Sequence, residues 1–198
     1  RVPFARAHQI CEAMRLRGRD HPLQALRPAL RCQSGQHWQW DGVTFEVLHP
    51  TPSLYEATSL KPNALSCVLH IRAATSGTQA GASALLAGDI EAAQELSLVH
   101  AHGTGLHADV LLVPHHGSRT SSSPAFLDAV SPRYAWVQAG YRNRFGHPAT
   151  PVVARYAERG ARVMESPQCG AMHWRSAQPA EMECERALRR RYWHHQSP

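Results

Sequence analysis

Two short motifs bring together side chains that can bind metal ions and phosphate. The first contains Asp89, and the second is the run 115–118, with two histidines, a glycine and a serine. Each follows an apolar run typical of a buried strand, at 84–87 and 110–113. Carboxylate and imidazole groups at strand ends are the ligands of many two-metal hydrolases. We therefore expect a metal-dependent hydrolytic site. The alternative is a surface loop with two unrelated histidines and a turn-capping aspartate.

The elements that must position these motifs alternate between strand and helix. A strand over 84–88 leads into a helix from about 90 to 100, and a strand over 109–113 follows. Such alternation predicts βα units in a layered α/β domain, whose active crevice lies at the carboxyl ends of the strands. We also predict a hairpin over 36–48 turning at Asp41 and Gly42, strands over 65–71 and 134–139, helices over 123–130 and 150–159 with a Thr150 cap, and a final strand pair over roughly 162–175.

The composition is that of a globular protein with a basic charge balance. The chain has 198 residues, of which 43% are hydrophobic and 18% charged, enough for one domain with a sizeable core. No apolar stretch approaches the roughly 20 residues needed to cross a bilayer. The formal net charge of +6 suits a polyanionic partner, although part of it lies in a basic C-terminal tail. The chain begins with Arg, so we expect it to be part of a longer protein.

The five cysteines follow no metal-binding or disulfide pattern. Cys11, Cys32, Cys67, Cys169 and Cys184 show no C-x-x-C spacing. Cys67 lies in an apolar strand, which predicts a small buried residue rather than a reactive one. The odd number argues against a complete disulfide framework and leaves a single bridge open.

Six segments in this order resemble the C-terminal metallo-β-lactamase-fold domain of ComEC-type DNA-uptake proteins of naturally competent bacteria. The likeness covers roughly residues 31–175. The segments are 35–50, 63–69, 86–90, 113–118, 143–148 and 169–170.

The resemblance implies an α/β domain with a four-layer αββα metallo-β-lactamase-like fold. This chain would hold its C-terminal half to two-thirds, with the N-terminal strands and the metal cluster missing. It would comprise a poorly determined segment over 1–30, the partial domain over 31–176 and a basic tail over 177–198.

The same resemblance assigns roles to the metal-binding motifs. Asp89 matches the aspartate that bridges two metal ions, and His116 matches the late histidine ligand. His115 is then a catalytic residue that contacts the phosphate, although the roles of the two histidines could be reversed. The metal would be Zn or Mn, as one or two ions.

Further residues would surround the scissile phosphate. His147 is placed there as a second catalytic residue, and the alternative is that it only closes a capped loop. We expect Asn63, His49 and His70 to have structural roles. The residues expected to bind phosphate are Ser118, Arg119, Asn143 and Arg144.

One departure from the family pattern limits the site. The fold's main signature is a His-x-His-x-Asp-His cluster, and the nearest string here, at 19–22, lacks the preceding histidines. The site in this chain is therefore incomplete, because a tight zinc site takes three or four protein ligands. We expect the chain alone to bind metal weakly and to hydrolyse little.

The functional expectation is a metal-dependent phosphodiesterase or nuclease that processes incoming DNA during natural transformation. Its partners would be the DNA backbone, the rest of a polytopic membrane channel and other DNA-uptake components. The domain would lie outside the bilayer, on the extracytoplasmic side of the inner membrane. A non-catalytic DNA-binding or assembly domain is the alternative. A small-molecule hydrolase fits the fold but not the paired histidines.

Overall fold

The computed structural model describes residues 31–74 and 81–191 of the 198. The predicted segment over 1–30, with the string at 19–22, lies outside the described residues, as does the end of the predicted tail.

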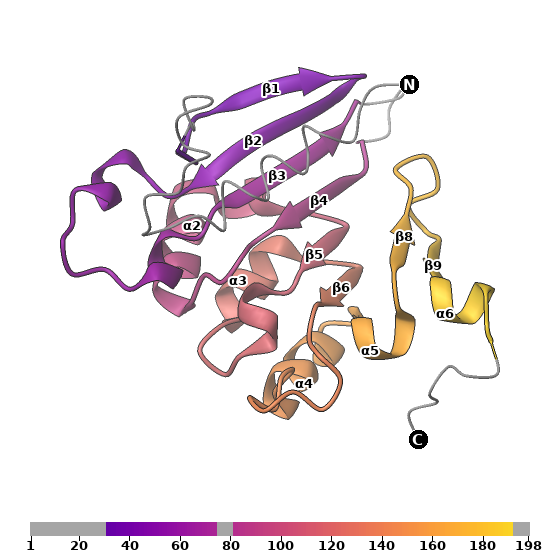
Figure 1. The fold of residues 1–198 in the computed structure, drawn as a ribbon. Helices are drawn as coiled ribbons and strands as arrows, with labels where there is room; N and C mark the ends of the chain where they lie inside the picture. Colours follow the sequence, from indigo (N-terminus) through magenta and orange to yellow (C-terminus); the bar gives the residue numbers. More distant parts are fainter. Residues whose placement is uncertain (1–30, 75–80, 192–198) are drawn as a thin grey trace, which may run out of the picture.

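A single seven-stranded mixed sheet organises the described chain, and its strand order follows the chain order (Figure 1). The first four strands pair antiparallel, and the fourth to seventh pair parallel. The carboxyl ends of β4, β5 and β6 therefore lie at one edge of the sheet, together with the start of β3. The strands are β1 (His37–Trp40), β2 (Val43–His49), β3 (Val68–Ala73), β4 (Ser83–Leu86), β5 (Val110–Leu112), β6 (Tyr134–Val137) and β7 (Arg162–Glu165).

The predicted hairpin at the start of the sheet is confirmed. Asp41 and Gly42 both have positive φ, 48° and 73°, which matches the right-handed twist of a two-residue hairpin. Trp38 on β1 stacks on Phe45 of β2, with ring centroids 5.1 Å apart. The turn residues and the alternating aromatics thus fix the register.

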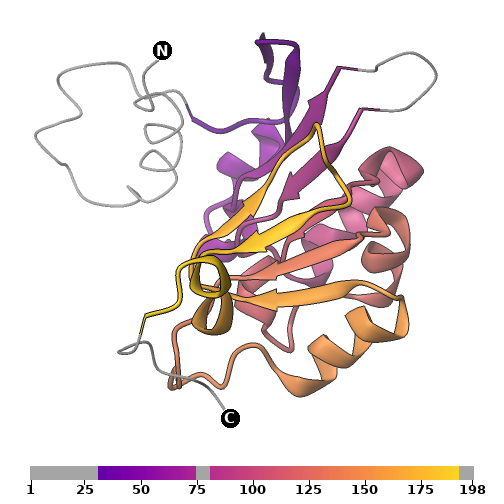
Figure 2. The same cartoon turned by 90° about the vertical axis from the view of Figure 1, so that its right-hand side faces the viewer.

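Three helices lie together on one side of the sheet (Figures 1 and 2). They are α2 (Ala92–His102), α3 (Pro124–Val130) and α4 (Thr150–Glu158). Their apolar side chains form the main core with the strands, and Phe126, Leu127 and Val130 of α3 are almost fully buried there. The connections contain single turns of 3₁₀ helix: η2 (Pro52–Tyr55), η3 (Pro62–Leu65), η4 (Gly103–Leu106) and η5 (Pro114–Gly117).

A second, smaller hairpin lies against the other face of the sheet. Ala135 and Val137 of β6 join the helix-side core, so Tyr134, directly before Ala135, points to the opposite face of the sheet. There the Tyr134 hydroxyl donates a 2.5 Å hydrogen bond to the Ala180 carbonyl. The hairpin consists of β8 (Met172–Trp174) and β9 (Met182–Cys184), flanked by α5 (Ser166–Cys169) and α6 (Glu185–Leu188).

Two details of the predicted elements are wrong. The two strands expected over 162–175 do not pair with each other, because β7 joins the large sheet and β8 pairs with β9. Strand β9 lies in the segment that was expected to be a tail. Thr150 is the first residue of α4 rather than its cap. The cap position is Ala149, whose N–H donates to the Gly117 carbonyl at 2.9 Å and holds the chain extended there.

The cysteines form two disulfides, one more than the single bridge that the sequence left open. Disulfides join Cys32 to Cys67 and Cys169 to Cys184, with Cα atoms 6.0 and 4.7 Å apart. Cys67 is buried as predicted but is cross-linked. The partners are 35 and 15 residues apart in sequence, so only the paired strands and hairpin bring them together.

The observed architecture agrees with the predicted α/β class. Among the described residues, no helix combines the length and apolar character that crossing a bilayer requires. The four-layer arrangement stays a prediction.

Candidate functional site

The candidate site lies at the edge of the sheet where β4, β5 and β6 end. Asp89 follows β4, the two adjacent histidines follow β5, and the loop that carries His147 follows β6. Because these strands are parallel neighbours, their following loops meet at one edge. The prediction that Asp89 and His116 converge there is confirmed.

The loop after β5 has an unusual backbone that directs the histidines. His115, His116 and Gly117 have φ values of 47°, 56° and 81°, so three consecutive residues are left-handed. Such a conformation is unfavourable for residues other than glycine and needs support from its surroundings. One such support is the His115 N–H, which donates to the Gly88 carbonyl at 2.9 Å. At Gly117 a Cβ would lie 2.7 Å from Cβ of Pro148, so glycine is required there.

Asp89 and His116 form a pair of converging acceptor atoms. The His116 Nδ1 lies 2.7 Å from the Gln138 carbonyl oxygen, which can only accept, so Nδ1 carries the proton of the neutral ring. The Nε2 lone pair then faces Asp89 Oδ1 at 3.5 Å. Two ligand atoms on a tetrahedral zinc ion, with bonds of about 2.1 Å, are about 3.4 Å apart. The pair therefore fits two positions of a metal coordination shell, with a carbonyl orienting the imidazole.

His115 is held on both ring nitrogens by residues from other elements. Its Nδ1 lies 3.3 Å from both Glu91 Oε1 and Thr120 Oγ1, and its Nε2 lies 3.4 Å from Asn63 Nδ2. The Thr120 hydroxyl donates to Glu91 at 3.1 Å, which leaves its oxygen as an acceptor for the ring N–H. The arrangement fixes the His115 ring and favours the tautomer protonated on Nδ1.

Sequence reasoning missed Glu91 and treated Asn63 as a turn residue. Glu91 stands two residues after Asp89, at the N-cap of α2, where its N–H donates to the Gln94 side chain at 3.2 Å. A second carboxylate two residues after a strand-end aspartate was the available signal. Asn63 lies in η3, and the antiparallel pairing of β3 with β4 brings that turn to the same edge.

His147 completes the group of histidines. Its ring centroid lies 6.0 Å from that of His115, and its buried Nδ1 makes no hydrogen bond among the described residues. Burial lowers the pKa of the His147 imidazole, and the nearby His115 and His116 lower it further. The ring is therefore neutral at pH 7, and residues 31–74 and 81–191 offer its Nδ1 no hydrogen-bond partner.

Of the four residues predicted to bind phosphate, two have exposed side chains, and the other two have side chains that already contact protein groups. Arg119 and Arg144 are exposed at this edge and can reach an anion. Ser118 is 8% exposed, with its hydroxyl 3.1 Å from that of Thr120. Asn143 uses both its side-chain oxygen and its nitrogen on backbone groups of its own loop.

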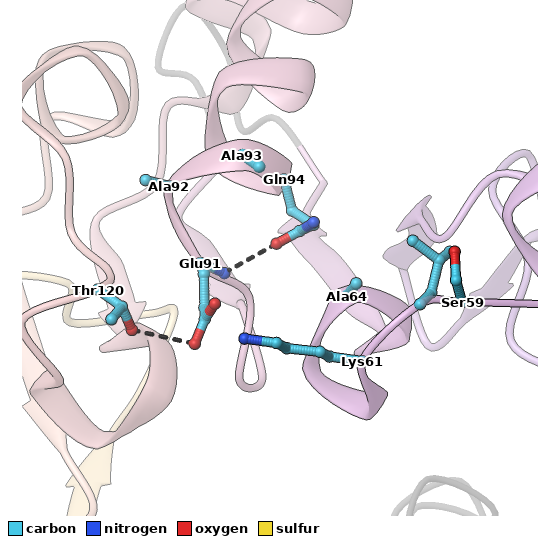
Figure 3. Close-up of a pocket in the computed structure, with 9 residues that line it drawn as sticks. Ser59, Lys61, Ala64, Glu91, Ala92, Ala93, Gln94 and Thr120 are labelled. Carbon is cyan, nitrogen blue, oxygen red and sulfur yellow. Dashed lines mark hydrogen bonds between the residues drawn. The ribbon is translucent and has the colours of Figure 1, made fainter.

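A pocket of about 330 Å³ adjoins the histidines. Its walls include Ser59 and Lys61 on one side and the start of α2 on the other, and Figure 3 shows Lys61 extending toward Glu91. Glu91 and Thr120 line it and also contact His115. The pocket and the histidine cluster therefore share a wall.

His49 and His70 are buried, and each ring contacts a backbone carbonyl rather than the histidines of the candidate site. The Nε2 atoms of His49 and His70 lie 3.0 Å from the carbonyls of Ala64 and His107. Burial, helped by Arg72, lowers the pKa of His70 to about 4. These contacts agree with structural roles.

Across residues 31–74 and 81–191, no group of three or more histidine, cysteine or acidic residues could hold a metal ion. Asp89 and His116 fit two coordination positions, fewer than the three or four protein ligands of a tight zinc site.

The chain is similar in sequence to several bacterial proteins, although no protein-family model matches it. It is 41% identical over 139 residues to competence protein ComA of Neisseria gonorrhoeae, covering 70% of this chain and 19% of that protein. It is 31% identical over 172 residues to the uncharacterized protein YcaI of Escherichia coli strain K12, a match that covers 83% of this chain and 21% of that protein. It is 34% identical over 95 residues to ComE operon protein 3 of Bacillus subtilis strain 168, a match that covers 48% of this chain and 12% of that protein.

The fold and the site together define an α/β domain with an aspartate and three histidines at the carboxyl edge of a mixed sheet. The relatives with competence names point to the competence and DNA-uptake family. The chain spans only about a fifth or less of the length of these relatives.

Proposed function

We propose that this chain forms part of a metal-dependent phosphodiesterase domain in a DNA-uptake protein, acting on incoming DNA. The observation that carries the proposal is the 3.5 Å convergence of Asp89 and His116, with His115 and His147 beside it. The similarity to proteins named for competence supports DNA as the substrate.

In the proposed site, Asp89 and His116 would hold part of a Zn or Mn centre. When bound, such a metal polarises the phosphate and supplies hydroxide at neutral pH. We expect His115, whose ring is held by Glu91 and Asn63, to act on the phosphate rather than to bind the metal. We expect His147, which lies beside His115, to be the second catalytic residue, and its lowered pKa makes a proton acceptor the role that fits it. Arg119 and Arg144 attract the DNA backbone without reading its sequence.

We further propose that the domain works on the extracytoplasmic side of the inner membrane, attached to a polytopic membrane channel and other DNA-uptake components. The two disulfides support this side, because disulfides form and persist in oxidising compartments and are rare in the cytosol.

The decisive experiment uses a protein extended upstream of Arg1 to include any further metal ligands. Its metal content and its cleavage of labelled DNA are measured with and without chelator, alongside Asp89→Asn. We expect chelator-sensitive cleavage, and we expect Asp89→Asn to lose cleavage together with metal. The matched control is Asp128→Asn, an exposed carboxylate on α3. DNA binding without metal and without cleavage would instead favour the alternative, a non-catalytic DNA-binding or assembly domain.

A further inference from the structure

The loop that follows β6 carries two exposed aromatic side chains, each with an arginine over its ring. Phe145 is 66% exposed and Tyr141 is 46% exposed, whereas most large apolar side chains are buried. The Arg144 guanidinium carbon lies 4.8 Å from the centre of the Phe145 ring, and that of Arg142 lies 5.2 Å from the centre of Tyr141. No acidic residue occurs between 139 and 149, so this surface is aromatic and positive.

The loop is held in shape from inside by Asn143. Its Oδ1 accepts the N–H groups of Phe145 and His147 at 3.2 and 3.0 Å, and its Nδ2 donates to the carbonyls of Gly140 and His147 at 3.0 and 2.6 Å. The exposed rings are therefore presented by a braced loop. Presenting a ring in a fixed position lowers the ordering cost of binding to it.

The exposed ring of Phe145 lies next to the histidine cluster, because it stacks on His147. Phe145 and His147 are nearly parallel, with an angle of 16° and ring centroids 5.8 Å apart. His147 in turn lies 6.0 Å from His115. A nucleotide held on Phe145 is thus a near neighbour of one whose phosphate reaches the histidines.

We propose that Phe145 is a stacking platform for an unpaired nucleobase, with Arg142 and Arg144 neutralising the flanking phosphates. Aromatic rings interleaved with arginines bind single-stranded nucleic acid irrespective of sequence, because every base has a face that can stack. In a duplex the base faces are already covered by their neighbours. The site therefore takes single-stranded DNA, or a frayed end, in preference to an intact duplex. This deepens the proposed function and rests on it for the reaction at the histidines.

The test separates base stacking from phosphate attraction. The 198-residue chain is titrated in EDTA against a fluorescein-labelled oligothymidylate and against an abasic oligonucleotide of equal length, and binding is followed by anisotropy. We expect Phe145→Ala to weaken binding to oligothymidylate about tenfold, a change within the range of one base stacked on an aromatic ring. Binding to the abasic strand stays unchanged. Phe145→Trp keeps the preference for oligothymidylate over the abasic strand, and Arg144→Ala weakens binding to both strands alike.

The matched control is Trp40→Ala, which removes another exposed aromatic side chain, from β1. It leaves both affinities unchanged. Equal affinity of the wild-type protein for the two strands, or unaltered oligothymidylate binding by Phe145→Ala, would overturn the proposal. Because binding is measured without metal, this result is independent of whether the metal-loaded, extended protein cleaves DNA.

Discussion

At the scale of single residues, the two adjacent histidines have different surroundings. His116 pairs with Asp89 and is oriented by a backbone carbonyl, whereas His115 is enclosed by Glu91, Thr120 and Asn63. A difference in partners implies a difference in role, because the group on one ring nitrogen decides what the other can do.

We therefore expect His116→Ala and His115→Ala to separate in the extended, metal-binding protein. His116→Ala should lower metal content and activity together. His115→Ala should reduce turnover of DNA by about 10²-fold or more while metal content stays near that of the wild type, as expected for loss of an acid–base or phosphate-contacting group. Metal analysis and single-turnover cleavage measure the two effects. Loss of metal in His115→Ala but not in His116→Ala would show that the roles are reversed.

The sequence predicted the convergence of Asp89 and His116 because both follow apolar runs that form parallel neighbours. It did not reveal Glu91 as the partner of His115. That contact depends on the left-handed backbone at His115, which no local propensity predicts for histidine. The use of Asn143 within its own loop was hidden for the same reason, since it depends on how the loop folds.

At the scale of elements, a buried carboxylate connects α2 to the loop that supports the site. Glu95 is fully buried, and its carboxylate accepts the N–H groups of Ser122 and Ser123 at 2.5 and 2.7 Å. Burial raises the pKa of Glu95, opposed by these hydrogen bonds and by Arg155. The same loop carries Thr120, which reaches His115. Helix α2 therefore fixes the position of a residue in the candidate site.

Glu95→Ala should lower the free energy of unfolding by about 2–5 kcal/mol, because two buried N–H groups lose their acceptor. Denaturant unfolding measures this loss, and hydrogen exchange at 118–123 should quicken with it. Glu158→Ala, an exposed position on α4, is the control and should change stability by less than about 0.5 kcal/mol. Equal stabilities of the two variants would mean that the carboxylate contributes nothing to the loop.

Most elements could be predicted because their signals are local. The turn residues Asp41 and Gly42 and the alternating aromatics define the first hairpin, and Pro124 marks the start of α3. The β8–β9 hairpin escaped prediction because its strands are three residues each and its packing on Tyr134 is a tertiary contact.

At the scale of the whole molecule, the two disulfides constrain different regions. Cys32–Cys67 ties the chain before β1 to the start of β3, and Cys169–Cys184 closes the second hairpin. From the loop lengths, the chain-entropy estimate is about 4 kcal/mol for the first and about 3 kcal/mol for the second.

Replacing Cys169 and Cys184 together by serine should therefore lower the free energy of unfolding by about 3 kcal/mol, and the Cys32 and Cys67 pair by slightly more. Thermal unfolding with and without reductant provides the measurement. Reductant should destabilise the wild-type chain and leave a variant lacking both bridges unchanged. A wild-type melting temperature insensitive to complete reduction would contradict the prediction.

The strand order of the sheet has a consequence for how the chain folds. Because β1 to β7 lie side by side in the order of synthesis, each new strand adds to an edge that the preceding strand has just created. Each pairing among β1 to β7 joins strands that are neighbours in the sequence, which keeps the contact order lower than in a sheet with its strands out of order. A chain that emerges from its N-terminal side can therefore add these strands one at a time. The loop after β6 then brings His147 to the site after β4 and β5, which carry Asp89, His115 and His116, have paired.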